Sequence, residues 1–226
     1  MAWAWVEARR DAPALLARAE TLARAGRGGD ALGPRGAWLI AVQDPGFRDH
    51  SGLDFSTPGA GATTLTQSLA KRLAFDRFTP GIRKLRQSAY AIGLEQRLDK
   101  DLILTLFLDT VPMGQGPDGW MTGFFAASQA VFHRPPAQLS DAEFLRLVAV
   151  MIAPSRFSLT GPDSALDRRA GRIARLIAGT CHPRDHGDVW LEGCAEDESA
   201  GIPPSGRSRF GLGSPHQLPP SAKARP

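Results

Sequence analysis

Apolar residues recur at the spacing of an α-helix along most of this sequence. Leu65, Leu69 and Leu73, for example, stand four residues apart and would line one face of a helix. No segment shows the convincing alternation of polar and apolar residues that marks a half-buried strand. The pattern therefore predicts a single mainly α domain of roughly 180 residues, followed by a short disordered tail.

Helix start signals divide the chain further. Asp11 and Asp99 stand where they would cap helices, and Ser140 with Glu143 fits the S-x-x-E capping box. The expected helices lie near residues 11–24, 64–74, 80–92, 99–107, 140–152 and 163–179. We divide the chain into an N-terminal helix and linker (1–36), the main domain (37–180) and an irregular, Gly/Pro-rich tail (181–226).

Charge and cysteine content exclude several classes of protein. The net charge of +4 is far from the dense basic stripe of a nucleic-acid binder, so we expect no nucleic-acid partner. Two cysteines exclude a disulfide-stapled scaffold. No signal peptide or transmembrane anchor can be recognised, and we therefore expect a soluble chain.

Basic residues are concentrated between residues 71 and 100, where the net charge is +5. The basic residues of this stretch are Lys71, Arg72, Arg77, Arg83, Lys84, Arg86, Arg97 and Lys100. Such a run is either a solvated helix face or a surface for an anionic ligand. The charge alone favours the solvated face, and the motifs below favour the ligand.

Two further patterns predict no site. Residues 114–119 match G-x-G-x-x-G, but a helical pattern precedes them and Pro117 interrupts them, unlike a dinucleotide-binding loop. Two cysteines and two histidines near the end of the domain have the spacing of no standard zinc finger. These residues are Cys181, His182, His186 and Cys194. We expect unrelated thiols, loop histidines and no metal site.

Four blocks of sequence, in order, carry a family resemblance. They are QDPGFRDHSGLD (43–54), GATTLTQSLAK (61–71), RKLRQ (83–87) and FLD (107–109) with the segments that follow it as far as Phe157. The blocks are similar to E-D-x-x-F-x-x-H-x-G-x-D, G-G-S-T-I-T-Q-Q-x-x-K, R-K-x-x-E and Y-L-N. These are motifs of the peptidoglycan glycosyltransferases, glycosyltransferase family 51. The resemblance covers residues 37–157.

The resemblance implies a mostly α-helical, lysozyme-like fold and an activity that polymerises lipid II, a disaccharide-pentapeptide on undecaprenyl pyrophosphate. It implies lipid II or a peptidoglycan glycan strand as the ligand, and other cell-wall synthesis proteins as partners. The family acts at the outer face of the cytoplasmic membrane. No cofactor is implied, although a pyrophosphate substrate is compatible with a divalent cation such as Mg²⁺.

The resemblance also implies roles for residues. The first-block glutamate of the family is the general base, and the glutamate of R-K-x-x-E assists at the donor end of the cleft. A pyrophosphate leaving group requires cations beside it. Lys71, Arg83 and Lys84 match the family's phosphate-contacting positions. The remaining substrate-binding positions implied are His50, Thr66 and Gln67.

Both family glutamates are replaced here, by Gln43 and Gln87. An amide keeps the shape of a carboxylate but cannot accept a proton near neutral pH. Positioned general bases contribute about 10²–10⁴-fold to rate, so both losses point to an inactive or severely slowed enzyme. Two smaller departures agree: residues 54–61 are a shorter linker than usual, and Asp109 stands where asparagine is usual.

Three hypotheses remain open at this stage. The first is a pseudoenzyme that keeps affinity for glycan or pyrophosphate-lipid, or serves as a partner module. The second is a working glycosyltransferase in which Asp44, adjacent to Gln43, or another carboxylate acts as the base. The third is a decayed domain with a structural role only.

Overall fold

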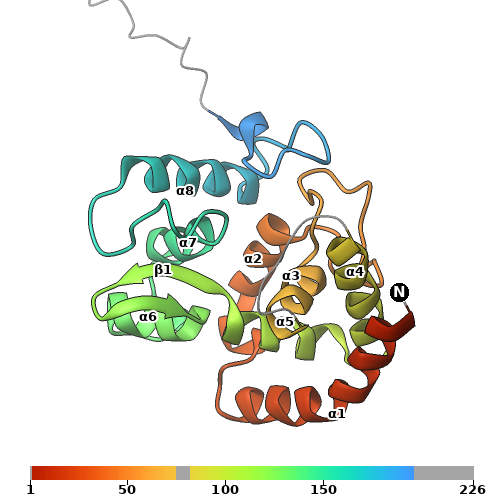
Figure 1. The fold of residues 1–226 in the computed structure, drawn as a ribbon. Helices are drawn as coiled ribbons and strands as arrows, with labels where there is room; N and C mark the ends of the chain where they lie inside the picture. Colours follow the sequence, from red (N-terminus) through yellow and green to blue (C-terminus); the bar gives the residue numbers. More distant parts are fainter. Residues whose placement is uncertain (1, 75–81, 196–226) are drawn as a thin grey trace, which may run out of the picture. The chain divides into compact units, whose positions relative to one another are not determined.

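The computed structural model describes residues 2–74 and 82–195 (Figure 1). For Ala2, Ile82 and Arg83 only the backbone is described, so the side chain of Arg83, an expected phosphate contact, lies outside the described part. The residues of the C-terminal tail after Ala195 lie outside it as well.

The described part is mainly α-helical, as predicted. Its elements are α1 (Ala2–Arg24), the 3₁₀ helix η1 (Gly29–Arg35), α2 (Gly36–Gln43), α3 (Leu65–Ala74), α4 (Ile82–Glu95), α5 (Lys100–Thr110), β1 (Pro112–Gly116), β2 (Gly119–Thr122), α6 (Phe124–Phe132), η2 (Pro136–Gln138), α7 (Asp141–Val150), α8 (Ser164–Ile177) and η3 (Glu192–Cys194). Among these residues no helix is both long and apolar enough to cross a membrane.

The two strands form an antiparallel hairpin that packs on α6 (Figure 1). The sequence did not predict this hairpin, because each strand has only five or four residues, too few for a period of two to show. Gly114 and Gly119 have φ values of +86° and +125°, a region that favours glycine. The G-x-G-x-x-G pattern is therefore explained by hairpin geometry.

Helix α1 begins at Ala2, well before the predicted start at Asp11. Its first half packs on α4 through small residues: Ala4 and Ala8 are fully buried, and a side chain at Gly93 would clash with Ala8. Asp11 does not cap this helix, and its carboxylate instead accepts a hydrogen bond from the Tyr90 hydroxyl at 3.0 Å. Tertiary packing thus extends the helix beyond its local start signal.

The other predicted caps are confirmed. The Asp99 carboxylate accepts a hydrogen bond from the backbone nitrogen of Leu102 at the start of α5. Ser140 and Glu143 form both hydrogen bonds of a capping box at the start of α7. These caps fix the starts of two helices that supply much of the buried core.

Asp109, at the end of α5, holds α1 in place. Its two carboxylate oxygens form ion pairs with Arg18 and Arg27, at 2.5 and 3.4 Å. An asparagine could not balance two guanidinium charges. The departure from the family pattern at this position is thus explained by contacts with α1 and with the segment that follows it.

Residues 181–195, which we call the 181–195 loop, are joined by a disulfide between Cys181 and Cys194. The expectation of unrelated thiols was wrong, because the chain turns back after α8 and brings the two Cα atoms to 5.2 Å. No cluster of three or more metal-ligating side chains occurs in the described part of the chain.

The 181–195 loop pairs with the short linker of residues 54–61. The backbone nitrogens of Gly59 and Gly61 donate to the carbonyls of Asp185 and His186, at 2.9 and 2.8 Å. The His186 Nδ1 donates in turn to the Thr57 carbonyl at 2.9 Å. The linker is therefore held by a segment that follows the helical domain in sequence.

Candidate functional site

A cavity of about 530 Å³ opens among the end of α2, helices α3, α5 and α8, the segment before α3, and the 181–195 loop. Its polar lining residues are Gln43, Thr63, Thr64, Ser68, Lys71, Arg72 and Arg169. Apolar side chains, among them Phe107, Met151 and Val189, complete the walls. The first and second sequence blocks therefore meet at one cavity.

The lining is cationic. Lys71, Arg72 and Arg169 contribute three positive charges, and none of the lining residues in the described part of the chain is an aspartate, a glutamate or a histidine. A cavity with this lining can bind an anion. Its described side chains offer no group that accepts a proton near neutral pH.

Gln43 is the last residue of α2 and lies at the cavity. Its side-chain amide donates to the carbonyl of Val148 at 3.3 Å, which leaves the amide oxygen available to a ligand as an acceptor. The structure thus brings the residue at the position of the family base to the cavity. In this chain that residue can form hydrogen bonds but cannot remove a proton.

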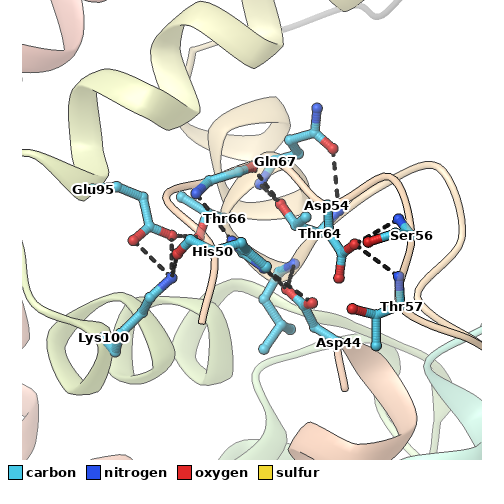
Figure 2. Close-up of polar contacts among 12 residues, drawn as sticks. Asp44, His50, Asp54, Ser56, Thr57, Thr64, Thr66, Gln67, Glu95 and Lys100 are labelled. Atoms are coloured by element: carbon cyan, nitrogen blue, oxygen red, sulfur yellow. Dashed lines mark hydrogen bonds and ion pairs between the residues drawn. The ribbon is translucent and has the colours of Figure 1, made fainter. Parts of the chain in front are cut away.

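Asp44 is fully buried and does not line the cavity. Figure 2 shows its carboxylate directed at the His50 ring, with Nε2 at 3.1 and 3.0 Å from the two oxygens. The same carboxylate accepts from the backbone nitrogen of Leu65 at 2.8 Å. Leu65 is the first residue of α3, so Asp44 places a negative charge at the positive end of that helix.

Both ring nitrogens of His50 are used by the protein itself. Nδ1 accepts from the backbone nitrogen of Gly52 at 3.0 Å, so the neutral ring carries its proton on Nε2 and donates it to Asp44. His50, an expected substrate contact, therefore joins the first block to the N-terminus of α3.

Thr64 and Gln67 form a capping box at the start of α3. The Gln67 backbone nitrogen donates to the Thr64 hydroxyl, and the Thr64 backbone nitrogen donates to the Gln67 side-chain oxygen, both at 3.1 Å. The Gln67 amide also donates to the Ser88 hydroxyl at 2.9 Å. With its side chain 4% exposed, Gln67 shapes the helix and does not line the cavity.

Thr66 belongs to a second buried network, shown in Figure 2. Its hydroxyl donates to the carboxylate of Glu95, which also forms an ion pair with Lys100 at 2.8 Å. Lys100 in turn donates to the carbonyl of His50 at 2.6 Å. Thr66, like Gln67, is therefore part of the scaffold behind the cavity.

Lys71 lines the cavity from α3, and Lys84 of α4 lies near enough for the charge of Lys71 to act on it. The Lys84 ammonium donates to the Ala62 carbonyl at 2.7 Å and to the Thr63 hydroxyl at 2.9 Å, next to the cavity lining. Burial lowers the pKa of Lys84, and the charge of Lys71 lowers it further. The structure thus brings these two expected phosphate contacts together.

Gln87 is 1% exposed and lies behind α3, outside the cavity lining. Its side-chain amide donates to the Gln67 carbonyl at 2.6 Å. Its own oxygen has no hydrogen-bond partner among the described residues. A glutamine suits this position, because an ionised carboxylate would face the carbonyl oxygen.

Asp54 closes the first block beside Gly46. Burial alone would raise its pKa, but hydrogen bonds from the Ser56 and Thr57 backbone and from the Thr57 hydroxyl outweigh this effect and lower the pKa to about 2. The carboxylate is therefore ionised and holds the start of the short linker.

Arg72 and Arg169 were not among the residues predicted for the site. Arg72 was counted only as one charge in the basic stretch. Arg169 stands three residues after Leu166 and four before Ile173, and these three are the buried residues of α8. An arginine on the apolar face of an amphipathic helix was a signal that the sequence offered.

Comparison with known proteins agrees with this arrangement. Residues 36–177 match the family model described as transglycosylase. The chain is 33% identical over 164 residues to a biosynthetic peptidoglycan transglycosylase of Citrobacter koseri, covering 66% of each chain. It is 29% identical over 155 residues to a protein of that name from Escherichia coli, covering 63% of this chain and 62% of the relative.

A penicillin-binding protein 2D of Bacillus subtilis is 31% identical over 151 residues, which are 61% of this chain and 21% of the relative. The chain thus spans about two thirds of the length of the two transglycosylases and about a fifth of the length of the penicillin-binding protein. The family match spans more than half of the chain and includes α2 to α8, the helices around the cavity. The chain therefore belongs to the transglycosylase family, and its mainly α, lysozyme-like fold is that of this family.

Proposed function

We propose that this transglycosylase domain binds lipid II, or the end of a glycan strand made from it, and does not polymerise it. The observation that carries the proposal is the cavity lining, which combines cations with Gln43 at the position of the base. The cations suit a pyrophosphate, and the glutamine suits a sugar hydroxyl as a hydrogen-bonding partner. Proton removal from that hydroxyl has no described residue to perform it.

The alternative of an active enzyme with Asp44 as its base has less support. Asp44 is fully buried and accepts hydrogen bonds from His50 and Leu65. A general base must lie within hydrogen-bond reach of the proton that it removes. For Asp44 to act, α3 would have to lose the charge at its N-terminus.

The disulfide supports a location of the domain outside the cytoplasm. Disulfides such as Cys181–Cys194 persist in oxidising compartments outside the cytoplasm. Lipid II is polymerised at the outer face of the cytoplasmic membrane. We therefore place the domain at that face, with lipid II or a glycan strand as its ligand and cell-wall synthesis proteins as its partners.

Fluorescent lipid II in detergent micelles tests both halves of the proposal. The wild type is expected to bind the lipid in an anisotropy titration and to yield no polymer on a gel, even after prolonged incubation. Lys84→Gln should weaken binding, since Lys84 is a cation at the cavity edge. Polymer formed by the wild type would refute the claim of inactivity, and absence of binding would refute the claim of a ligand.

A further inference from the structure

Two arginines reach the cavity from different helices. Arg72 comes from α3 and Arg169 from α8, and both line the cavity. Arg169 is only 4% exposed. Among the described residues, Nη2 of Arg72 and both Nε and Nη1 of Arg169 have no hydrogen-bond acceptor. Buried polar groups without a partner are rare in folded proteins and call for an explanation, of which an anion bound in the cavity is one.

The partners of Arg72 are neutral. Its Nε donates to the Thr110 hydroxyl at 3.1 Å, and its Nη1 donates to the Ser68 hydroxyl at 2.7 Å. The guanidinium also lies 4.8 Å from the centre of the Phe107 ring. These contacts orient the side chain but leave its charge without an ion pair in the described part of the protein.

Two carboxylates, those of Asp188 and Glu192, raise the pKa of Arg169, but both form hydrogen bonds or ion pairs with other residues. Asp188 accepts hydrogen bonds from the backbone nitrogens of Arg184, Glu192 and Gly193. Glu192 forms an ion pair with Arg172. Burial lowers the pKa of both Arg72 and Arg169 to about 10, and the charge of Arg172 lowers that of Arg169 further.

We propose that Arg72 and Arg169 form a second oxyanion subsite in the cavity, which binds a doubly charged phosphate or pyrophosphate group. Two guanidinium groups that form no ion pair among the described residues match a dianion better than a single carboxylate, and their planar donors suit phosphate oxygens. Ser68 and Thr110 position Arg72 within the subsite. In lipid II the anion would be the pyrophosphate, and this assignment of its source rests on the proposed function.

The subsite is distinct from the pair of lysines. Lys84 contacts Ala62 and Thr63 beside Lys71, on the side of α4. Arg72 contacts Thr110 and Phe107, on the side of α5. The cavity thus has Arg72 and Arg169 in its lining and Lys84 next to its edge, so cations reach it from more than one side.

Calorimetric titration of the full chain with inorganic pyrophosphate tests the subsite. Arg72→Gln and Arg169→Gln should each weaken pyrophosphate binding at least about tenfold, the lower range for loss of a charge-assisted hydrogen bond. Arg168→Gln removes an equal charge from an exposed position of the same helix and should leave the affinity unchanged. Acetate, with a single charge, should bind the wild type no better than it binds Arg169→Gln.

A thermal shift series separates binding from folding. Arg169→Met removes a poorly compensated buried charge, so without ligand its melting temperature should equal or exceed that of the wild type. Pyrophosphate should raise the melting temperature of the wild type but not that of Arg169→Met. Arg169→Lys, which keeps the charge without the planar fork, should restore this increase only in part.

The subsite is refuted if Arg72→Gln and Arg169→Gln bind pyrophosphate as tightly as the wild type, whatever lipid II does. If pyrophosphate binding depends on the arginines but the wild type fails to bind lipid II, the subsite stands and the proposed function is wrong. Binding of phosphate as tightly as pyrophosphate, with both arginines required for each, would support the subsite and identify a free phosphate as a sufficient source of the anion.

Discussion

At the scale of single residues, the carboxylate that survives in the first block stabilises the fold. Asp44 accepts a hydrogen bond from His50 and another from the first backbone nitrogen of α3. A buried carboxylate that accepts hydrogen bonds at a helix N-terminus is strongly stabilising. Its removal would leave the Nε2–H of His50 and the backbone N–H of Leu65 without an acceptor. The residue beside it, Gln43, faces the cavity.

Asp44→Asn should therefore lower the free energy of unfolding by about 1–3 kcal/mol, the cost of an unsatisfied buried polar group. The asparagine amide would face the Nε2–H of His50, a contact between two donors, because Nδ1 already accepts from Gly52. Urea unfolding followed by circular dichroism measures the change. Asp49→Asn, at an exposed position nearby, is the control. Equal stability of Asp44→Asn and the wild type would contradict the role assigned to Asp44.

Gln87→Glu should destabilise the protein in a pH-dependent way. Only a protonated glutamic acid can donate to the Gln67 carbonyl as the glutamine does, so the folded-state pKa of the new side chain should be raised. Stability is then close to that of the wild type below about pH 4, the ordinary range of a glutamate, and falls as the pH rises above it. Urea unfolding between pH 4 and pH 8 measures this. A pH-independent difference from the wild type would show that residue 87 is not held as described.

At the scale of elements, local signals predicted much of the structure. The capping box of α7 was predicted from S-D-A-E, and α3 and α8 were predicted from their apolar faces. The capping box of α3, at T-L-T-Q, was not predicted. The β1–β2 hairpin was missed because its strands are short and rich in glycine. The disulfide was missed because the pairing of Cys181 with Cys194 depends on how the chain turns after α8.

The site was predicted in part for a similar reason. Of the motif residues, Lys71 and Gln43 line the cavity. His50 and Thr66 also match motif positions, but their polar atoms are bonded within the protein. A sequence pattern does not distinguish residues that shape a cleft from residues that contact its ligand. Arg169 lies outside every motif and depends on the packing of α8.

Loss of the disulfide between Cys181 and Cys194 should lower both stability and ligand affinity. Replacing both cysteines, as Cys181→Ser with Cys194→Ser, should cost about 3 kcal/mol of stability, the value for a closed loop of similar length. The 181–195 loop bonds to Gly59 and Gly61 and contributes Val189 to the cavity, so affinity for lipid II should fall as well. Urea unfolding and the anisotropy titration measure the two effects.

A reducing agent is the control for this change. It should bring the wild type to the stability of the double serine variant and leave that variant unaffected. An effect of the reductant on the double serine variant, or none on the wild type, would contradict the assigned role of the disulfide.

At the scale of the whole domain, the proposed function rests on the composition of the cavity. Its walls come from α2, α3, α5, α8 and the 181–195 loop, and they bring cations from two helices to one space. Of the two positions where the family carries glutamate, only that of Gln43 lines the cavity, whereas Gln87 is buried behind α3. The central claim of the proposed function is that the domain retains a ligand site and lacks the base.

Polymerisation of fluorescent lipid II by Gln43→Glu, compared with the wild type, tests this claim most directly. Both proteins are fused to the same membrane anchor, and the products are separated on a gel. Restoring the carboxylate changes one terminal NH₂ to O⁻, and a positioned base contributes about 10²–10⁴-fold, so Gln43→Glu should form glycan polymer where the wild type forms none. Gln87→Glu alone should form none. Polymer made by the wild type at a rate equal to that of Gln43→Glu would contradict the account, because the base would then lie elsewhere.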